Sequence, residues 1–293
     1  MANRQTSEAL TGLATAWFQK QGWEPFAFQQ KTWEAFLEGK HGLLNAPTGS
    51  GKTYALWFPI LLQYLKDHPD YRHQTSKGLK AIWITPLRAL SQEIRQSALR
   101  IVEDLDIPFT VGIRTGDTSQ SERARQRKQM PDLLITTPES LQLLLATKGY
   151  ARTFRNCFAI VVDEWHELLG SKRGVQMELA LSRLKTVCPS LRIWGISATI
   201  GNLEQAREVL LGPESEALRN AVLIRASLNK KITVRSLLPE KIETFPWRGH
   251  MGLHLLDAVI PIIQASKTTL IFTNTRGQCE IWFQKILELS LIH

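Results

Sequence analysis

The sequence contains few cysteines and no long hydrophobic run. Cys157, Cys188 and Cys279 are far apart and odd in number, which argues against a disulfide framework or a zinc cluster and favours a reducing cytoplasm. No apolar run is long enough to cross a bilayer, and the first ten residues lack the hydrophobic core of a signal peptide. Internal repeats and low-complexity tracts are also missing. We therefore expect a cytoplasmic globular protein rather than a secreted, membrane-spanning or repeat protein.

Positive charge is in excess over negative charge. The 293 residues include 36 Lys and Arg against 27 Asp and Glu, which gives a net charge of +9. A basic surface attracts phosphate backbones, so nucleic acid is a reasonable partner. A soluble basic protein without such a partner fits the charge equally well. Apolar residues, at 43%, are sufficient for a large core in a chain of this length.

Short apolar runs alternate with helical patterns along most of the chain. The runs HGLLNAP, KAIWITP, FTVGIRT, DLLITTP, FAIVVDE and LRIWGISAT are continuous rather than alternating, as is typical of strands buried on both faces of a parallel sheet. We therefore predict an α/β fold, a doubly wound parallel sheet, over residues 1–213. In such a fold, ligands bind beyond the carboxyl ends of the strands.

The pattern changes after residue 213. Residues 214–245 are basic and β-leaning, and we predict a linker and a first strand region there. Residues 246–293 predict a helix that Pro261 bends or interrupts, followed by a strand, a turn and a second helix. These elements resemble the start of a second α/β domain, with too few strands for a complete sheet. We expect the chain to be a fragment of a longer protein.

The segment APTGSGKT follows the first predicted strand and precedes a helix. It fits a variant of the phosphate-binding loop in which alanine replaces the first glycine. Its glycines allow a turn whose amides face phosphate oxygens; Lys52 would reach the β- and γ-phosphates, and Thr53 would bind Mg²⁺. The alternative is a glycine turn with an incidental lysine. The predicted nucleotide-binding residues are Ala46, Pro47, Thr48, Gly49, Ser50, Gly51, Lys52 and Thr53.

A pair of carboxylates follows another buried strand, FAIVV. Asp163 would hold Mg²⁺, and Glu164 would orient and deprotonate the attacking water. The alternative is a pair of acidic residues that stabilises the start of a helix. Together with Lys52, these two carboxylates are the predicted catalytic residues.

The motifs resemble those of superfamily 2 DExH-box helicases in order and spacing. APTGSGKT, TPLRAL, TTPES, DEWH and SAT resemble motifs I, Ia, Ib, II and III; PFAFQQKTW resembles the Q-motif region, and IFTNTR the start of motif IV. DEWHEL and SATIGNLEQA are most similar to the large helicase-related group and its bacterial ligase-associated branch. The resemblance implies a RecA-like domain and the incomplete start of a second one, with ATP and Mg²⁺ bound between the two domains of the whole protein.

The resemblance also implies roles for further residues. Gln29 would read the adenine edge, His166 would link the ATP site to motif III, and Ser197, Ala198 and Thr199 would couple hydrolysis to domain movement. The alternatives are that Gln29 is an exposed glutamine on a helix and that His166 caps a helix turn. Implied nucleic-acid contacts are Thr85, Pro86, Arg88, Thr115, Gly116, Asp117, Thr136, Thr137, Pro138, Asn274 and Arg276. Ordinary strand-to-helix caps are the alternative for the contacts in the first domain.

The family resemblance implies an ATP-dependent translocase or helicase. It implies 3′ to 5′ movement on DNA, a link to DNA repair, single-stranded or tailed duplex nucleic acid as substrate, and repair ligase and nuclease partners. The alternatives are an ATP-gated nucleic-acid-binding module without unwinding activity, an RNA helicase of the DEAD-box type, and a P-loop ATPase that acts on proteins. After IFTNTR the sequence contains no arginine. We therefore expect residues 1–293 alone to bind ATP and Mg²⁺ but to hydrolyse ATP slowly, because the family's arginine finger lies later.

Overall fold

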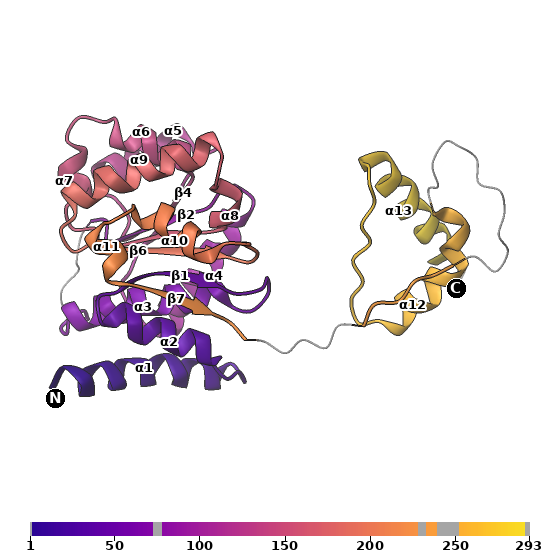
Figure 1. Cartoon of the computed structure of the whole chain (residues 1–293), viewed down its shortest axis with the longest axis horizontal. Coiled ribbons are helices and arrows are strands. Elements are labelled where there is room, and N and C mark those ends of the chain that lie inside the picture. Colours follow the sequence, from indigo (N-terminus) through magenta and orange to yellow (C-terminus); the bar gives the residue numbers. More distant parts are fainter. Residues whose placement is uncertain (1, 73–77, 228–232, 239–251, 291–293) are drawn as a thin grey trace. The chain divides into compact units, whose positions relative to one another are not determined.

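The computed structural model of the chain describes residues 2–72, 78–227, 233–238 and 252–290. The chain divides into two compact units, Met1–Leu228 and Asn229–His293 (Figure 1). No helix of the described residues is both long and apolar enough to cross a membrane.

A sheet of seven parallel strands forms the centre of the first unit, which confirms the predicted parallel sheet; six of its strands, β1 to β6, lie in the six apolar runs of the sequence. The strand order is β3-β4-β2-β5-β6-β1-β7. All side chains of β2, β4 and β5 are buried, which explains why their sequences are apolar without alternation. The strands are β1 (His41–Asn45), β2 (Ala81–Ile84), β3 (Val111–Arg114), β4 (Leu133–Thr136), β5 (Ala159–Val162), β6 (Arg192–Ser197) and β7 (Ala221–Arg225).

Helices cover both faces of this sheet and form two hydrophobic cores (Figure 1). Leu44 and Trp83 face α1–α4, whereas their neighbours Leu43 and Ile82 face α6–α11. This alternation follows from the period of two residues along a strand. The helices are α1 (Ala2–Lys20), α2 (Ala27–Leu37), α3 (Lys52–Asp67), α4 (Leu90–Asp104), α5 (Gln120–Lys128), α6 (Pro138–Leu145), α7 (Tyr150–Phe154), α8 (Trp165–Leu168), α9 (Lys172–Val187), α10 (Leu203–Leu211) and α11 (Glu216–Arg219).

The first unit extends beyond residue 213, where the sequence pattern places its end. β7 pairs in parallel with β1 over five residues, from His41↔Ala221 to Asn45↔Arg225. The segment after residue 213 therefore continues the first unit, with α11 and then β7 as the edge strand of the sheet. Part of the predicted linker, at 228–232 and 239–245, lies outside the described residues.

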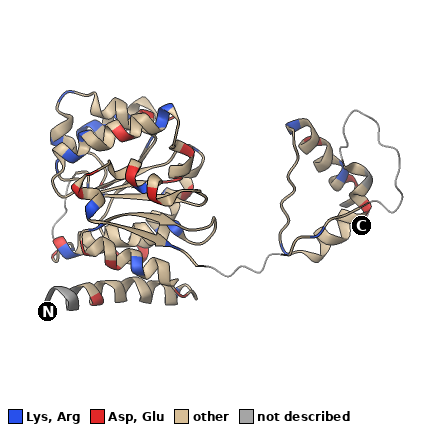
Figure 2. Ribbon diagram, in the orientation of Figure 1, with Lys and Arg blue, Asp and Glu red and all other residues tan. Residues whose placement is uncertain are grey.

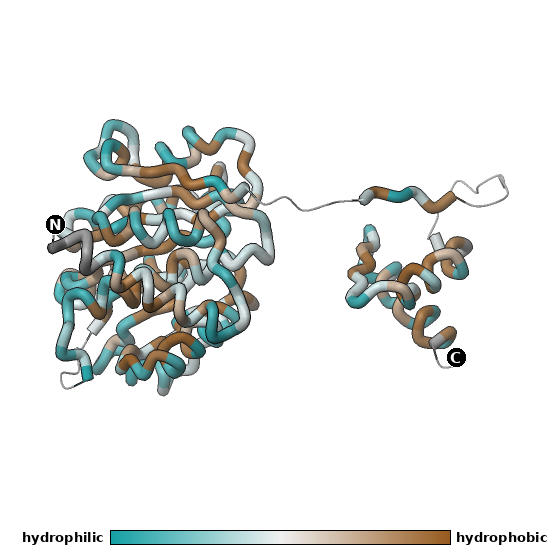
Figure 3. Tube along the Cα trace, turned by 90° about the horizontal axis from the view of Figure 1, so that it is seen from below, coloured by the Kyte–Doolittle hydropathy of each residue, from teal (hydrophilic) through white to brown (hydrophobic). Residues whose placement is uncertain are grey.

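The described part of the second unit is helical. It contains a short 3₁₀ turn (Leu253–Leu255), α12 (Leu256–Ala265), which continues past Pro261, and α13 (Arg276–Ser290). The strand predicted at the start of TTLIFTNTR is not formed, since the described residues of this unit provide no strand to pair with. Several apolar side chains of the unit are exposed, including Phe272 at 88%. Figure 3 shows hydrophobic and hydrophilic residues along the trace of each unit.

Candidate active site

A short loop connects β1 to α3 and leaves the start of that helix open. Gly49 and Gly51 have φ angles of +74° and +79°, which residues with a Cβ atom rarely adopt. A Cβ on Gly51 would also lie 2.8 Å from Nε2 of Gln29. The N-cap residue of α3 is Gly51, which has no side chain to cap the first turn, so the amides and the positive dipole end of this helix can hold an anion.

Lys52 is the first residue of α3 and is buried. Its Nζ atom has no hydrogen-bond partner among the described residues, and Glu164 Oε1 lies 3.6 Å away. A buried ammonium without hydrogen bonds costs free energy, and a phosphate group would supply the missing acceptors. The glycine loop and this lysine therefore fit a nucleotide phosphate.

Gln29 lies in α2 and is 1% exposed. Its Oε1 accepts a hydrogen bond from the Phe26 amide at 2.8 Å, and its Nε2 donates to the Gly51 carbonyl at 3.0 Å. Both ends of the side-chain amide thus bind backbone, and the residue fixes the start of α2 against the phosphate loop. Reading of the adenine edge by Gln29 stays a prediction.

Asp163 follows β5 and is almost fully buried. Its Oδ2 accepts a hydrogen bond from Trp83 Nε1 at 3.2 Å, and its Oδ1 accepts one from the Glu164 amide at 2.9 Å. Burial, together with the charge of Glu164, raises the pKa of Asp163 to about 6; the two hydrogen bonds and Lys52 only partly oppose that shift. A divalent cation would restore the ionised form, which suits this carboxylate to a metal site.

Glu164 adopts a left-handed backbone conformation with φ +46°. Such a conformation costs a non-glycine residue about 1 kcal/mol or more; it is common at functional sites, although Asp106 and Glu214 also adopt it in this chain. It directs the carboxylate between Lys52 and His166, whose Nδ1 lies 3.4 Å from Glu164 Oε2. A carboxylate held in this way can accept a proton from water.

The end of β6 joins the same cluster. Ser197 is fully buried, and its Oγ atom lies 3.1 Å from Nδ1 of His166. Asn45, at the end of β1, donates from Nδ2 to the carbonyl groups of Ser197 and Ala198. Thr199 is exposed beyond the strand end, so the structure does not bring its hydroxyl to His166. The sequence pattern missed Asn45, because an asparagine before a phosphate loop has no local signature.

The strand order divides the carboxyl edge of the sheet into two halves. Lys52 and Asp163 follow β1 and β5, and Ser197 ends β6; these three strands are neighbours in the sheet. The predicted nucleic-acid loops follow β2, β3 and β4, which are also neighbours. The Trp83–Asp163 hydrogen bond connects the two halves where β2 meets β5.

Most of the predicted nucleic-acid contacts in this second half are buried. Thr136 Oγ1 donates to the Arg114 carbonyl at 2.6 Å, and Thr137 Oγ1 caps the start of α6 by accepting from the Ser140 amide. These hydroxyl groups bind backbone in this structure, and their contact with phosphate stays a prediction. The buried residues are Thr85, Pro86, Thr115, Thr136, Thr137 and Pro138.

Arg88, Gly116 and Asp117 lie on the surface of the same half. Arg88 Nη1 is 2.9 Å from Asp117 Oδ1, and a Cβ on Gly116 would lie 2.8 Å from Arg88 Nη2. Arg123 of α5 donates to the carbonyl groups of Thr115, Gly116 and Thr118 and so holds this loop. Arg123 therefore has a structural role in this loop. Figure 2 shows that acidic and basic residues are interspersed over the helices.

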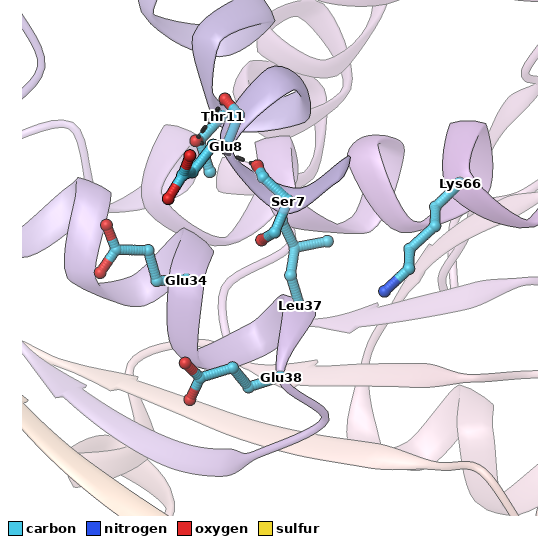
Figure 4. Close-up of a pocket in the computed structure, with 7 residues that line it drawn as sticks. All are labelled: Ser7, Glu8, Thr11, Glu34, Leu37, Glu38 and Lys66. Atoms are coloured by element: carbon cyan, nitrogen blue, oxygen red, sulfur yellow. Dashed lines mark hydrogen bonds between the residues drawn. The ribbon is translucent and has the colours of Figure 1, made fainter. Parts of the chain in front are cut away.

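A cavity of about 590 Å³ lies away from this edge, between α1, α2 and the end of α3 (Figure 4). Glu8, Glu34 and Glu38 line it together with Lys66. An acidic lining repels phosphate groups, so this cavity does not suit a nucleotide. The described residues contain no group of three or more His, Cys, Asp or Glu that could hold a metal without further ligands.

Comparison with known proteins identifies the family. The DEAD/DEAH box helicase family matches residues 26–206, which include the phosphate loop, Asp163 and Ser197. The chain belongs to the DEAD/DEAH box helicase family. The ATP-dependent helicase Lhr-Core of Methanothermobacter thermautotrophicus is 33% identical to this helicase chain over 251 residues, which cover 83% of the chain and 29% of the relative.

Two further relatives support an Lhr-like helicase. The Lhr helicase/uracil glycosylase of Escherichia coli is 29% identical over 93% of this chain and 19% of its own length. The structure of Mycobacterium smegmatis helicase Lhr bound to ssDNA and AMP-PNP has a TM-score of 0.72 and 26% identity over 94% of this chain and 36% of that chain. The predicted superfamily and group are confirmed, and the ligase-associated branch stays a prediction. The chain spans less than a third of the length of the curated relatives it matches first.

Two predicted nucleic-acid contacts of this helicase chain lie in the second unit. Asn274 and Arg276 are both exposed, and Arg276 Nε lies 3.5 Å from Glu280 Oε1 on the next turn of α13. Both residues have access to solvent on the surface of their unit. Their contact with nucleic acid stays a prediction.

Proposed function

We propose that the chain is the ATP-binding part of a nucleic-acid translocase or helicase. The observation that supports this function best is the strand order, because the glycine loop with Lys52 and a set of strand-to-helix loops lie side by side on one edge of the sheet. The two halves share a direct contact, from Trp83 on β2 to Asp163 at the end of β5. A change at the ATP phosphates can thus reach the neighbouring loops through few atoms.

The side chains have distinct roles in the proposed ATP hydrolysis. Lys52 binds the terminal phosphates and exchanges its present contact with Glu164 for phosphate oxygens. Glu164, released from Lys52, orients the attacking water and accepts its proton. Thr53 and Asp163 would hold Mg²⁺, which when bound supplies positive charge against the phosphate oxygens. His166 and Ser197 link the Glu164 carboxylate to the end of β6.

The substrate is proposed to be DNA, with movement from 3′ to 5′ and a role in DNA repair. The Mycobacterium smegmatis Lhr structure with ssDNA and AMP-PNP, at 26% identity, supports single-stranded DNA over RNA. The direction and the repair role rest on the family resemblance alone. Repair ligase and nuclease partners belong to the same proposal.

A titration of labelled strands tests the proposed function. Fluorescence anisotropy of a single-stranded DNA, an RNA of the same sequence and a blunt duplex gives three affinities, each measured with and without AMP-PNP and Mg²⁺. We expect the single strands to bind, with DNA preferred, and the nucleotide to change their affinity. Equal affinity for all three substrates, without any effect of nucleotide, would contradict the proposal.

A further inference from the structure

Arg173 joins two loops of the proposed nucleic-acid edge. From α9, its Nε donates to Glu139 Oε1 at 2.6 Å, and its Nη2 donates to the Pro86 carbonyl at 2.9 Å. A third contact, from Nη2 to Glu139 Oε2, measures 3.4 Å. Pro86 belongs to the loop after β2, and Glu139 to the first turn of α6 after β4. One guanidinium group therefore fixes the spacing between these two loops.

The position of Arg173 depends on the segment that follows Glu164. α8 begins directly after Glu164, and its last carbonyl, that of Leu168, accepts hydrogen bonds from the amide and the hydroxyl of Ser171. Ser171 in turn caps α9 by accepting from the Gly174 amide at 3.1 Å. A Cβ on Gly174 would lie 2.1 Å from the Leu168 carbonyl oxygen, so only glycine permits this close approach.

The contact between Arg173 and Glu139 is an ionic one. Desolvation alone would raise the pKa of Glu139, but the hydrogen bond from Arg173 and the residue's own amide outweigh it and lower that pKa. The planar guanidinium reaches the carboxylate and a carbonyl oxygen at the same time. Lysine carries the same charge, but its ammonium group lacks the planar fork that contacts both oxygen atoms at once.

We propose that Arg173 is a positioning residue that transmits the state of the ATP site to the nucleic-acid edge. A shift of Glu164 or His166 on nucleotide binding moves α8, the tight turn at Ser171 and then the first turn of α9. Arg173 carries that movement to the Pro86 loop and to α6 together. This role rests on the proposed function, because it presumes that these loops bind a nucleic-acid strand.

Three variants of the chain test this role: Arg173→Lys, Arg173→Ala and, as a matched control, Lys172→Ala, which removes an exposed cation next to it. For each, anisotropy gives the affinity for single-stranded DNA with and without AMP-PNP and Mg²⁺, and calorimetry gives the affinity for AMP-PNP alone. Hydrogen exchange follows the peptides that contain residues 85–90 and 136–142. Thermal melting checks that the variants fold.

We expect both Arg173 variants to bind single-stranded DNA about tenfold more weakly than the parent chain when nucleotide is present. The ratio of DNA affinities with and without nucleotide should fall towards one, both peptides should exchange faster, and AMP-PNP affinity should be unchanged. Lys172→Ala should change DNA affinity by less than about twofold, as expected for one exposed cation at moderate salt.

The outcomes separate this inference from the proposed function. If Arg173→Lys binds DNA like the parent while Arg173→Ala does not, the residue contributes charge and not position, and the inference is wrong. If all three variants match the parent in affinity and in nucleotide response, the inference is also wrong while the proposed function stands. If the parent chain binds no single strand under any condition, the proposed function itself fails.

Discussion

Substitution of Glu164 by glutamine separates the two roles that a carboxylate can have beside a nucleotide. Glu164 lies 3.6 Å from Lys52 Nζ, and both side chains are largely buried. Glu164→Gln keeps the size of the side chain and removes its charge and its ability to accept a proton. We expect ATP–Mg²⁺ to bind more tightly to this variant and turnover to be lost.

The size of the effect follows from the distance between the charges. Two unit charges at 3.6 Å attract by about 4–5 kcal/mol in an effective dielectric constant of roughly 20. The phosphate replaces Glu164 as the partner of Lys52, and Glu164 retains some exposure, so only a fraction of that energy is gained. A net gain of about 1 kcal/mol corresponds to roughly fivefold tighter binding. Loss of the general base should lower turnover about 10²- to 10⁴-fold.

Isothermal titration calorimetry with AMP-PNP and Mg²⁺ at pH 8 measures the binding, and a phosphate-release assay measures the turnover. At this pH Asp163, with a pKa of about 6, is ionised in both proteins. Asp163→Asn is the control, and its affinity should depend much less on Mg²⁺. If Glu164→Gln binds the nucleotide more weakly than the parent and loses its Mg²⁺ dependence, Glu164 holds the metal and the two roles must be exchanged.

Four further predictions concern other parts of the molecule. Lys52→Ala should weaken AMP-PNP binding by about 2–3 kcal/mol in calorimetry, the scale of a lost charged contact; unchanged affinity would remove the phosphate-loop interpretation. Gly51→Ala should lower the free energy of unfolding by about 1–2 kcal/mol in urea, because φ is +79° and Gln29 lies too close, whereas Gly12→Ala in the exposed middle of α1 should raise it by about 0.5–1 kcal/mol. The pKa of His41 is lowered from 6.5 to about 4, first by burial and then by Lys185 and Arg192, and its Nδ1 accepts from the Ile193 amide. The unfolded chain therefore binds this proton at a higher pH than the folded chain, so the free energy of unfolding should decrease as pH falls from 6.5 towards 4. Urea titrations at several pH values should show a smaller decrease for His41→Gln. Affinity for single strands should fall steeply with salt and vary little with base sequence; a strong preference for one sequence at equal salt would contradict backbone contacts.

The sheet and the part of the site around the glycine loop were predictable from the sequence, because local sequence determines most of their features. Continuous apolar runs mark strands that are buried on both faces, and the glycines of the phosphate loop occupy positions with positive φ. The carboxylate pair stands where β5 ends, and the topology of a parallel sheet brings it to Lys52. The strands and the glycine turn are set within a few residues of the chain, and the meeting of Lys52 with the carboxylates follows from the predicted parallel sheet.

The remaining features depend on contacts between distant segments. β7 belongs to the first sheet only because β1 offers it an edge, some 180 residues earlier in the sequence. The sequence also gives no sign that the hydroxyl groups of Thr85 and Thr136, at the ends of β2 and β4, donate to backbone carbonyl groups. Arg173 contacts residues 34 and 87 positions away, and a single arginine in a helix has no local signal of such contacts.

The most direct test of the account is the steady-state rate of ATP hydrolysis with and without single-stranded DNA. The account predicts slow turnover by the chain that increases when the strand is added and disappears in Glu164→Gln, because one edge of the sheet carries both sites. A rate that the strand leaves unchanged, or turnover that survives in Glu164→Gln, would contradict it.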